Sequence, residues 1–236
     1  MKIPRDFNNL QALAVSVARL GRGLIARPGT RQPEQMLELY EFEACPFCRK
    51  VRDVLTELDI SFVSRTCAKG ANTRDEVSAR LGKGQFPYLI DPNTGQEMVE
   101  SEAIIDYLYA TYAAQPRGRV DKLLAPLNTA GAAFAGLLRV RGARVRPGHG
   151  QRTQPAEMLE VWNFEASPYC RKVREALHEL NLDFVTHNVG KRSARRPQLV
   201  ALGGKMRVPY LVDPNTETAM YESNDILAYL YATYGG

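Results

Sequence analysis

An internal repeat limits the possible folds of this chain more than any other feature. When the sequence is shifted by 122 residues, residues 36–112 align with residues 158–234 without a gap, and about half of the aligned positions are identical. Self-similarity at a fixed period indicates a structural unit that occurs more than once. A chain of 236 residues is long enough for one or two domains. We therefore predict two similar domains in tandem.

The same order of strands and helices is expected in both copies. Alternating apolar residues predict strands, and apolar residues three and four positions apart predict helices. In the first copy the predicted strands are residues 36–42, 60–67, 86–91 and 97–101, and the predicted helices are residues 47–59, 73–82 and 101–112. Gly82 is placed to end the second helix, and Ser101 is expected as the N-cap of the third. The order βαβ then ββα predicts an α/β fold with a right-handed crossover between two parallel strands.

An Ala/Leu-rich stretch that ends in arginines precedes each copy, at residues 10–29 and 123–148. We interpret each stretch as a short helix that covers an apolar face of a small domain, and an amphipathic helix on a membrane surface is the alternative. The predicted parts of the chain are residues 1–34 (helix and basic linker), 35–113 (first domain), 114–157 (helix and Arg-rich linker) and 158–236 (second domain).

Composition argues against several classes of protein. The net charge of +5 is concentrated in the two connecting segments, and the chain has no DNA-reading motif, so no nucleic-acid partner is expected. No apolar run is long enough to span a bilayer. Four cysteines are too few for a disulfide scaffold and fit a reducing compartment, so the expected location is the cytoplasm. A transit peptide in the basic first 33 residues is the alternative.

The sequence Cys45-Pro-Phe-Cys48 carries the most specific chemistry, because it falls where a strand ends and a helix begins. The amides and dipole at a helix N-terminus favour a thiolate. We expect Cys45 to be exposed at the turn and to attack a disulfide, and Cys48 to resolve the mixed disulfide. Arg49 and Lys50 are expected to add positive charge. One CxxC motif with three scattered histidines makes no zinc set, so no metal site is expected.

These motifs resemble the thioredoxin superfamily, specifically glutaredoxins and the N-terminal domain of glutathione S-transferases. "CPFCRKVR" resembles the glutaredoxin dithiol motif, "FPYL" and "VPYL" resemble the strand with a cis-proline, and "ESEAIIDYL" and "ESNDILAYL" resemble the acidic-Ser motif of the last helix. The resemblance covers both repeats. It implies two tandem thioredoxin-like domains with glutathione as ligand, and disulfide or glutathionylated molecules as substrates.

The resemblance also implies which residues hold glutathione. Backbone groups next to the two prolines would bind its cysteine, and the acidic-Ser pairs would bind its γ-glutamyl end. The residues in these positions are Phe86, Pro87, Glu100 and Ser101 in the first copy, and Val208, Pro209, Glu222 and Ser223 in the second. A plain helix cap at Ser101 and an ordinary edge-strand proline at Pro87 are the structural alternatives.

The second copy departs from the dithiol motif, because Ser167 replaces the attacking cysteine while Cys170 remains. Two interpretations stay open. Ser167 resembles the serine of plant-type transferases, which hydrogen-bonds the glutathione thiol; alternatively, the second domain is degenerate and kept for structure or ligand binding. Cys170 is expected to be buried and inert in both. Cys67 has no counterpart in the second copy and is interpreted as structural, with a third redox thiol as the alternative.

The sequence therefore favours a glutathione-dependent thiol–disulfide oxidoreductase whose first domain is catalytic. One alternative is a glutathione transferase that conjugates electrophiles with the help of Ser167. The other is a non-catalytic module that binds glutathione, or an iron–sulfur cluster through Cys45. Because the two copies are so similar, a monomer that imitates a dimer within one chain is also expected.

Overall fold

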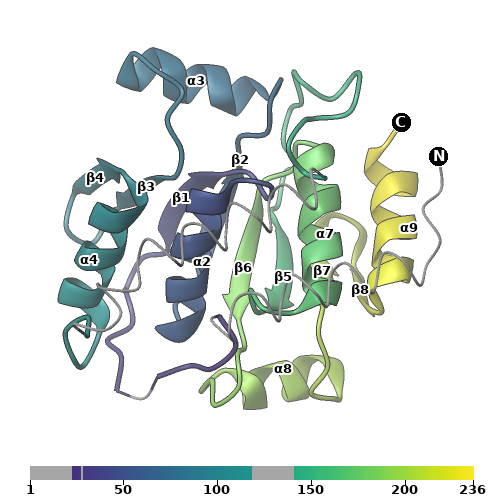
Figure 1. Cartoon of the computed structure of the whole chain (residues 1–236). Helices are drawn as coiled ribbons and strands as arrows, with labels where there is room; N and C mark the ends of the chain where they lie inside the picture. Colours follow the sequence, from purple (N-terminus) through teal and green to yellow (C-terminus); the bar gives the residue numbers. More distant parts are fainter. Residues whose placement is uncertain (1–22, 28, 119–140) are drawn as a thin grey trace.

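The computed structural model describes residues 23–27, 29–118 and 141–236. Most of the two predicted leading helices, residues 10–22 and 123–140, lies outside these described residues. The two repeats fold into two βαβ–ββα units, and their strands join into one sheet of eight strands in the order β4-β3-β1-β2-β6-β5-β7-β8 (Figure 1). The prediction of an α/β protein with two thioredoxin-like units is confirmed.

Each unit has the element order that the sequence predicts. The first contains β1 (Leu37–Glu41), α2 (Pro46–Glu57), β2 (Phe62–Thr66), α3 (Asn72–Leu81), β3 (Tyr88–Asp91), β4 (Gln96–Val99) and α4 (Ser101–Tyr112). The second contains β5 (Leu159–Asn163), α7 (Pro168–Glu179), β6 (Phe184–Asn188), α8 (Arg196–Gly203), β7 (Tyr210–Asp213), a 3₁₀ turn (Pro214–Thr216), β8 (Thr218–Tyr221) and α9 (Ser223–Tyr234).

The two units join through their second strands. Strands β1 and β2 are parallel, as are β5 and β6, whereas β2 and β6 pair antiparallel across the junction. At the centre of this pairing Val63 lies opposite Val185, and these two residues occupy the same position in the repeat. The flanking pairs, Phe62 with Thr186 and Ser64 with Phe184, also exchange equivalent positions. The units are therefore related by an approximate twofold axis through this pair, as in an isologous dimer.

Apolar residues separate into clusters on the two faces of the sheet. On one face, α2 and α4 pack against the first unit, and α7 and α9 pack in the same way against the second (Figure 1). On the other face, Val77 of α3 packs with Cys67 and Tyr88, and Leu199 of α8 packs with Trp162. Among the described helices, none has the length and apolar content needed to cross a bilayer.

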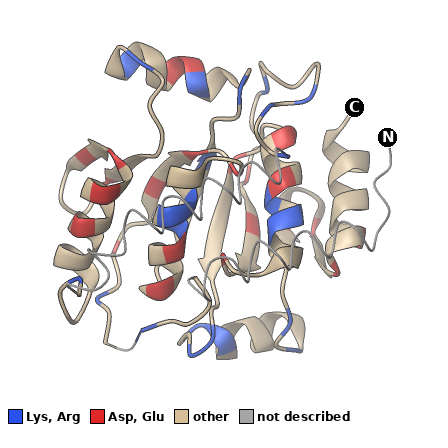
Figure 2. Cartoon of the chain, in the orientation of Figure 1, with Lys and Arg blue, Asp and Glu red and all other residues tan. Residues whose placement is uncertain are grey.

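Helices α2 and α7 are buried on all sides. Every residue from Cys48 to Glu57 is buried, and so is every residue from Cys170 to His178, although both segments contain several charged side chains. Buried charges require ionic or hydrogen-bonding partners. Figure 2 shows that basic and acidic residues of both signs occur along these two helices in the middle of the structure.

The partners of these charges come from both units. We call Glu43, Arg52, Glu165 and Arg174 the central ion cluster; Glu43 and Arg52 are the repeat equivalents of Glu165 and Arg174. Arg52 lies 2.9 Å from Glu165 and 3.2 Å from Glu43. Arg174 lies 3.0 Å from Glu43 and 2.8 Å from Glu165. Both arginines hold the pKa values of Glu43 and Glu165 below their usual range although burial opposes this, so both carboxyl groups remain charged beside the arginines.

The helix ends confirm one prediction and correct another. Gly82 ends α3 in a left-handed conformation, with a φ of 71°, as predicted. Ser101 is not the N-cap of α4; it is the first helical residue, and Glu100 occupies the cap with a φ of 73°. The positive φ at Glu100 turns the chain from β4 directly into the helix, so the cap falls one residue earlier than expected.

Candidate active sites at the two strand–helix turns

Strand pairing brings the predicted site segments of the first unit together. Tyr40, near the end of β1, pairs with Tyr88 at the start of β3, and Tyr88 also pairs with Val99 at the end of β4. The turn after β1 carries Cys45, while the residue before Tyr88 is Pro87 and the residue after Val99 is Glu100. These three segments consequently meet at the same end of strands β1, β3 and β4.

Cys45 lies at the N-cap of α2, where its sulfur accepts a hydrogen bond from the amide of Cys48 at 3.3 Å. A hydrogen bond from the Cys48 side chain, with the amides of Cys48 and Phe47 and the charge of Arg52, lowers the pKa of the Cys45 thiol against the opposing effect of burial. Burial and the same contact with Cys45 raise the pKa of Cys48 well above its ordinary value. The pair therefore consists of a sulfur poised to ionise and a neighbour that keeps its proton.

One expectation about this turn is wrong. Cys45 is only 3% exposed rather than open to solvent, and its sulfur accepts the Cys48 amide at the start of the helix. Arg49 and Lys50 lie in the first turns of α2 as expected, and they form ion pairs with Glu165 and Glu102 respectively. The cation that lowers the Cys45 pKa is instead Arg52, a member of the central ion cluster.

The predicted glutathione residues of the first copy lie around the same edge. The peptide bond between Phe86 and Pro87 is cis, as expected. Glu100 accepts a hydrogen bond from the side chain of Gln85, which connects the proline loop with the start of α4. Ser101 is buried there. The structure thus brings Phe86, Pro87, Glu100 and Ser101 to one end of the hairpin, as the sequence predicts.

The second copy repeats this arrangement with a hydroxyl in place of the thiol. Ser167 is the N-cap of α7, and its oxygen accepts a hydrogen bond from the amide of Cys170 at 3.3 Å. Burial raises the pKa of Cys170, which is completely inaccessible. Cys170 therefore lies in an environment that disfavours its thiolate, which agrees with the prediction that it is inert.

A pocket of about 270 Å³ lies beside this turn. It is lined by Tyr169, Arg207, Val208, Pro209, Glu222 and Ser223. Four of these are the predicted glutathione residues of the second copy, and the bond between Val208 and Pro209 is cis. Ser167 is 5% exposed and is not among the lining residues. Its hydroxyl is therefore near the pocket wall but not part of it.

Sequence reasoning missed two residues of this pocket. Tyr169 is 50% exposed, and Arg207 forms an ion pair with Glu222 at 2.7 Å. The available signal was the difference between the copies, since Arg207 replaces Gln85 directly before the predicted proline pair. An arginine there gives the second pocket a cation that the first site does not have at this position.

The two turns do not share a cleft. Because β2 and β6 are antiparallel, β1 and β5 run in opposite directions through the common sheet. Each candidate site follows the C-terminal end of its own strand, so the turns with Cys45 and Ser167 lie at opposite ends of the strands in the common sheet. The chain therefore carries two separate candidate sites.

The remaining cysteine, Cys67, is not one of the residues of either candidate site. Cys67 is buried at the end of β2, where burial raises its pKa well above the ordinary value. It packs with Val77 and Tyr88, which fits the structural interpretation. Within the described part of the chain, no three His, Cys, Asp or Glu side chains are grouped so that they could hold a metal ion.

Comparison with known families gives a match in both units. The model of the glutathione S-transferase N-terminal domain matches residues 39–116 and again residues 162–236. These two ranges cover more than half of the chain and agree with the repeats found in the sequence.

Individual relatives are similar over about one domain. Protein URE2 of Candida maltosa is 36% identical over 88 residues, which is 35% of this chain and 26% of the relative. Glutathione S-transferase 1 of Schizosaccharomyces pombe is 36% identical over 77 residues, which is 31% of this chain and 34% of the relative. The chain thus spans about a quarter to a third of the length of these relatives.

Among solved structures, one described as "Leishmania TDR1 - a unique trimeric glutathione transferase" aligns with 85% of this chain and 67% of its own. The sequence identity is 15% and the TM-score is 0.29, so the alignment adds nothing to the argument.

Proposed function

Because the chain belongs to the glutathione S-transferase N-terminal domain family, we propose that it binds glutathione and that its first unit uses Cys45 for glutathione-dependent thiol–disulfide exchange. Cys45 attacks a glutathione mixed disulfide, the leaving thiol takes a proton, and glutathione stays bound to Cys45 through a new disulfide. Cys48 then loses its proton and attacks the Cys45 sulfur as a thiolate, and the glutathione that leaves takes up a proton. The resulting Cys45–Cys48 disulfide is reduced by two further glutathione molecules, which leave as glutathione disulfide.

The observation that carries the proposal is the unequal environment of the two sulfurs. Thiol exchange needs a thiolate for the attack, and a neighbouring thiol that keeps its proton can stabilise that thiolate by a hydrogen bond. The Cys48 contacts lower the pKa of Cys45, while burial raises that of Cys48. Since Cys45 is 3% exposed, the substrate reaches its sulfur only when neighbouring side chains move aside.

Titration of the thiolates by ultraviolet absorbance tests this proposal. We expect one cysteine of the reduced protein to ionise below the ordinary range of about 8.5, and Cys45→Ser to remove this transition. Cys48→Ala is expected to shift the transition upward, because the largest stabilising contact is lost. The matched control Cys170→Ser should leave it unchanged. A Cys45 that ionises only in alkali, or a Cys48→Ser protein that forms no mixed disulfide with glutathione disulfide, would contradict the proposal.

A glutathione transferase acting through the second unit is the second candidate function. The pocket with Tyr169, Arg207 and Glu222 favours it, and a relative named glutathione S-transferase agrees with it. Ser167 lies at the N-cap of α7 close to this pocket, where its hydroxyl would hydrogen-bond the glutathione thiolate after a small rearrangement. In this reaction the glutathione thiol loses its proton to solvent, and its sulfur displaces a leaving group such as chloride, which departs as an anion.

The conjugation of glutathione with a chlorinated dinitrobenzene tests this second candidate. We expect Ser167→Ala to lower the rate by roughly tenfold to a hundredfold, since a single hydrogen bond to a charged group contributes about 1.5–3 kcal/mol. Cys45→Ser, at the equivalent position of the other unit, serves as the control and should not change the rate. A wild-type protein without conjugation activity, or one unaffected by Ser167→Ala, would eliminate this candidate.

A further inference from the structure

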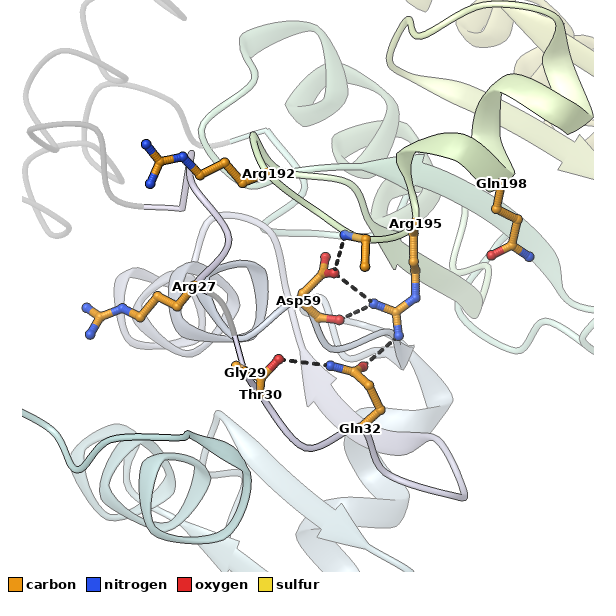
Figure 3. Close-up of a pocket in the computed structure, with 9 residues that line it drawn as sticks. Arg27, Gly29, Thr30, Gln32, Asp59, Arg192, Arg195 and Gln198 are labelled. Carbon is orange, nitrogen blue, oxygen red and sulfur yellow. Dashed lines mark hydrogen bonds and ion pairs between the residues drawn. The ribbon is translucent and has the colours of Figure 1, made fainter.

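A second pocket lies at the junction of the two units and shares no lining residue with the pocket beside Ser167. Its volume is about 340 Å³. The first unit and the segment before it contribute Arg27, Gly29, Thr30, Gln32 and Asp59, and the second unit contributes Arg192, Ala194, Arg195 and Gln198 (Figure 3). The size is within the range of small-molecule sites, and the lining comes from segments far apart in the sequence.

The approximate twofold axis places an equivalent position on the other side of the molecule, and there the chain fills the space itself. Two residues separate Gly29 from Gln32, whereas five separate Gly148 from Gln154 in the corresponding segment. The longer segment brings two backbone carbonyls, those of residues 149 and 150, to within 3.0 and 3.2 Å of the side-chain nitrogen of Asn181. The pocket is therefore the space that the shorter first segment leaves open.

The residues around the open pocket differ in charge from those around the filled position. Asn181 corresponds to Asp59, and Gly70 corresponds to Arg192. Arg195 compensates Asp59, because its guanidinium binds the carbonyl of Asp59 and lies 3.6 Å from the carboxylate. Arg195 also donates to Gln32 at 2.7 Å. Arg27 is paired with Glu57 at 3.2 Å, so among the described residues that line the pocket the uncompensated positive charge comes from Arg192.

Arg192 is the most informative of these residues. It is exposed, and no ion pair connects it to another described residue. Its φ is 67°, a left-handed conformation that disfavours an arginine, whereas Gly70 occupies the equivalent position at a φ of 93° without this strain. A strained residue at a pocket is a reason to look for a function of its side chain. Figure 3 shows Arg192 and Arg27 extending to the same side of the pocket.

We propose that this junction pocket binds a small molecule through an anionic group, a phosphate or a carboxylate, held by Arg192 with Arg27 beside it. Guanidinium groups bind both kinds of oxyanion with paired hydrogen bonds. Because the lining comes from both units, the bound anion connects them through residues that do not belong to the central ion cluster. This site is independent of the proposed glutathione chemistry.

Calorimetric titration of the full chain with inorganic pyrophosphate and with citrate tests the proposal. We expect one saturable site per chain for at least one probe, and the stronger probe identifies the preferred group. Arg192→Gly places the residue of the other repeat at this position, so it preserves the fold while removing the cation, and it should weaken binding at least tenfold. The control is Arg146→Gln, which should leave binding unchanged. Arg146 is the counterpart of Arg27 in the other repeat and lies over Tyr231 as Arg27 lies over Tyr109, but it does not line the pocket.

Two further variants separate this site from other anion sites. Arg207→Gln changes the arginine of the proposed glutathione pocket and should leave binding of the probe unchanged. Copying residues 149–151 between Gly29 and Thr30 should fill the pocket and abolish binding, while the melting temperature is maintained. The proposal is overturned if neither probe saturates, if Arg192→Gly binds as tightly as the wild type, or if binding survives the insertion.

Discussion

Replacing Cys45 with serine is expected to abolish glutathione-dependent reduction of a glutathionylated peptide, with a loss of roughly a thousandfold or more. A serine hydroxyl stays protonated at neutral pH and cannot form the disulfide on which the exchange depends. Cys48→Ser should retain part of the activity, since Cys45 still carries the mixed disulfide and glutathione itself can resolve it. The initial rate of peptide reduction, coupled to glutathione reductase, measures both effects.

Cys170→Ser is the matched control for this experiment. Cys170 occupies in the second unit the position of Cys48, but its neighbour is Ser167 and burial raises its pKa. We therefore expect the control to reduce the peptide at the wild-type rate. Substantial activity in the Cys45→Ser protein would show that another group performs the attack, and the proposed function of the first unit would have to be abandoned.

Removing one arginine from the central ion cluster is expected to have the largest effect on stability. Arg52→Ala leaves Glu165 without its partner at 2.9 Å and also takes the counter-charge from Glu41 and Glu43. Loss of one partner from a buried ion pair costs about 3–5 kcal/mol, because the remaining charges stay desolvated. Arg174→Ala should destabilise the protein by a similar amount. Urea denaturation followed by circular dichroism measures the free energy of unfolding.

An exposed ion pair provides the control for this second prediction. Arg80 pairs with Glu97 on the surface, with side chains 54% and 39% exposed. Arg80→Ala should cost less than about 1 kcal/mol, because solvent screens such pairs. If Arg52→Ala were no more destabilising than Arg80→Ala, the central ion cluster would not hold the two units together.

Much of the fold and of both candidate sites could be predicted from the sequence because each depends on local patterns. Alternating apolar residues located the strands, and the repeat showed that the second copy has the same order of elements. The resemblance to the glutathione S-transferase N-terminal domain implied that the residues around Pro87 and Pro209 act with the acidic-Ser pairs, and the hairpin of each unit brings these segments together. Each of these patterns can be recognised within a few neighbouring residues or by comparing the two copies of the repeat.

The environment of Cys45 could not be predicted in the same way. The sequence indicated positive charge from Arg49 and Lys50 near Cys45, but it did not indicate that Arg49 and Arg52 are buried against Glu165 of the other unit. This contact depends on the pairing of β2 with β6, and the sequence of β2 does not reveal which strand lies beside it. The same reasoning explains why the junction pocket was missed, since its lining residues are far apart in the chain.

The antiparallel pairing of Val63 with Val185 has a consequence for how the chain can be divided. Strand β2 is an interior strand only because β6 pairs with it. In an isolated N-terminal fragment, β2 would be an edge strand with unpaired amide and carbonyl groups. Exposed edge strands tend to pair with other chains. Equivalent residues already pair across the junction of β2 and β6. A second copy of the same fragment can therefore take the place of the missing unit, and we expect the isolated fragment to form homodimers through β2.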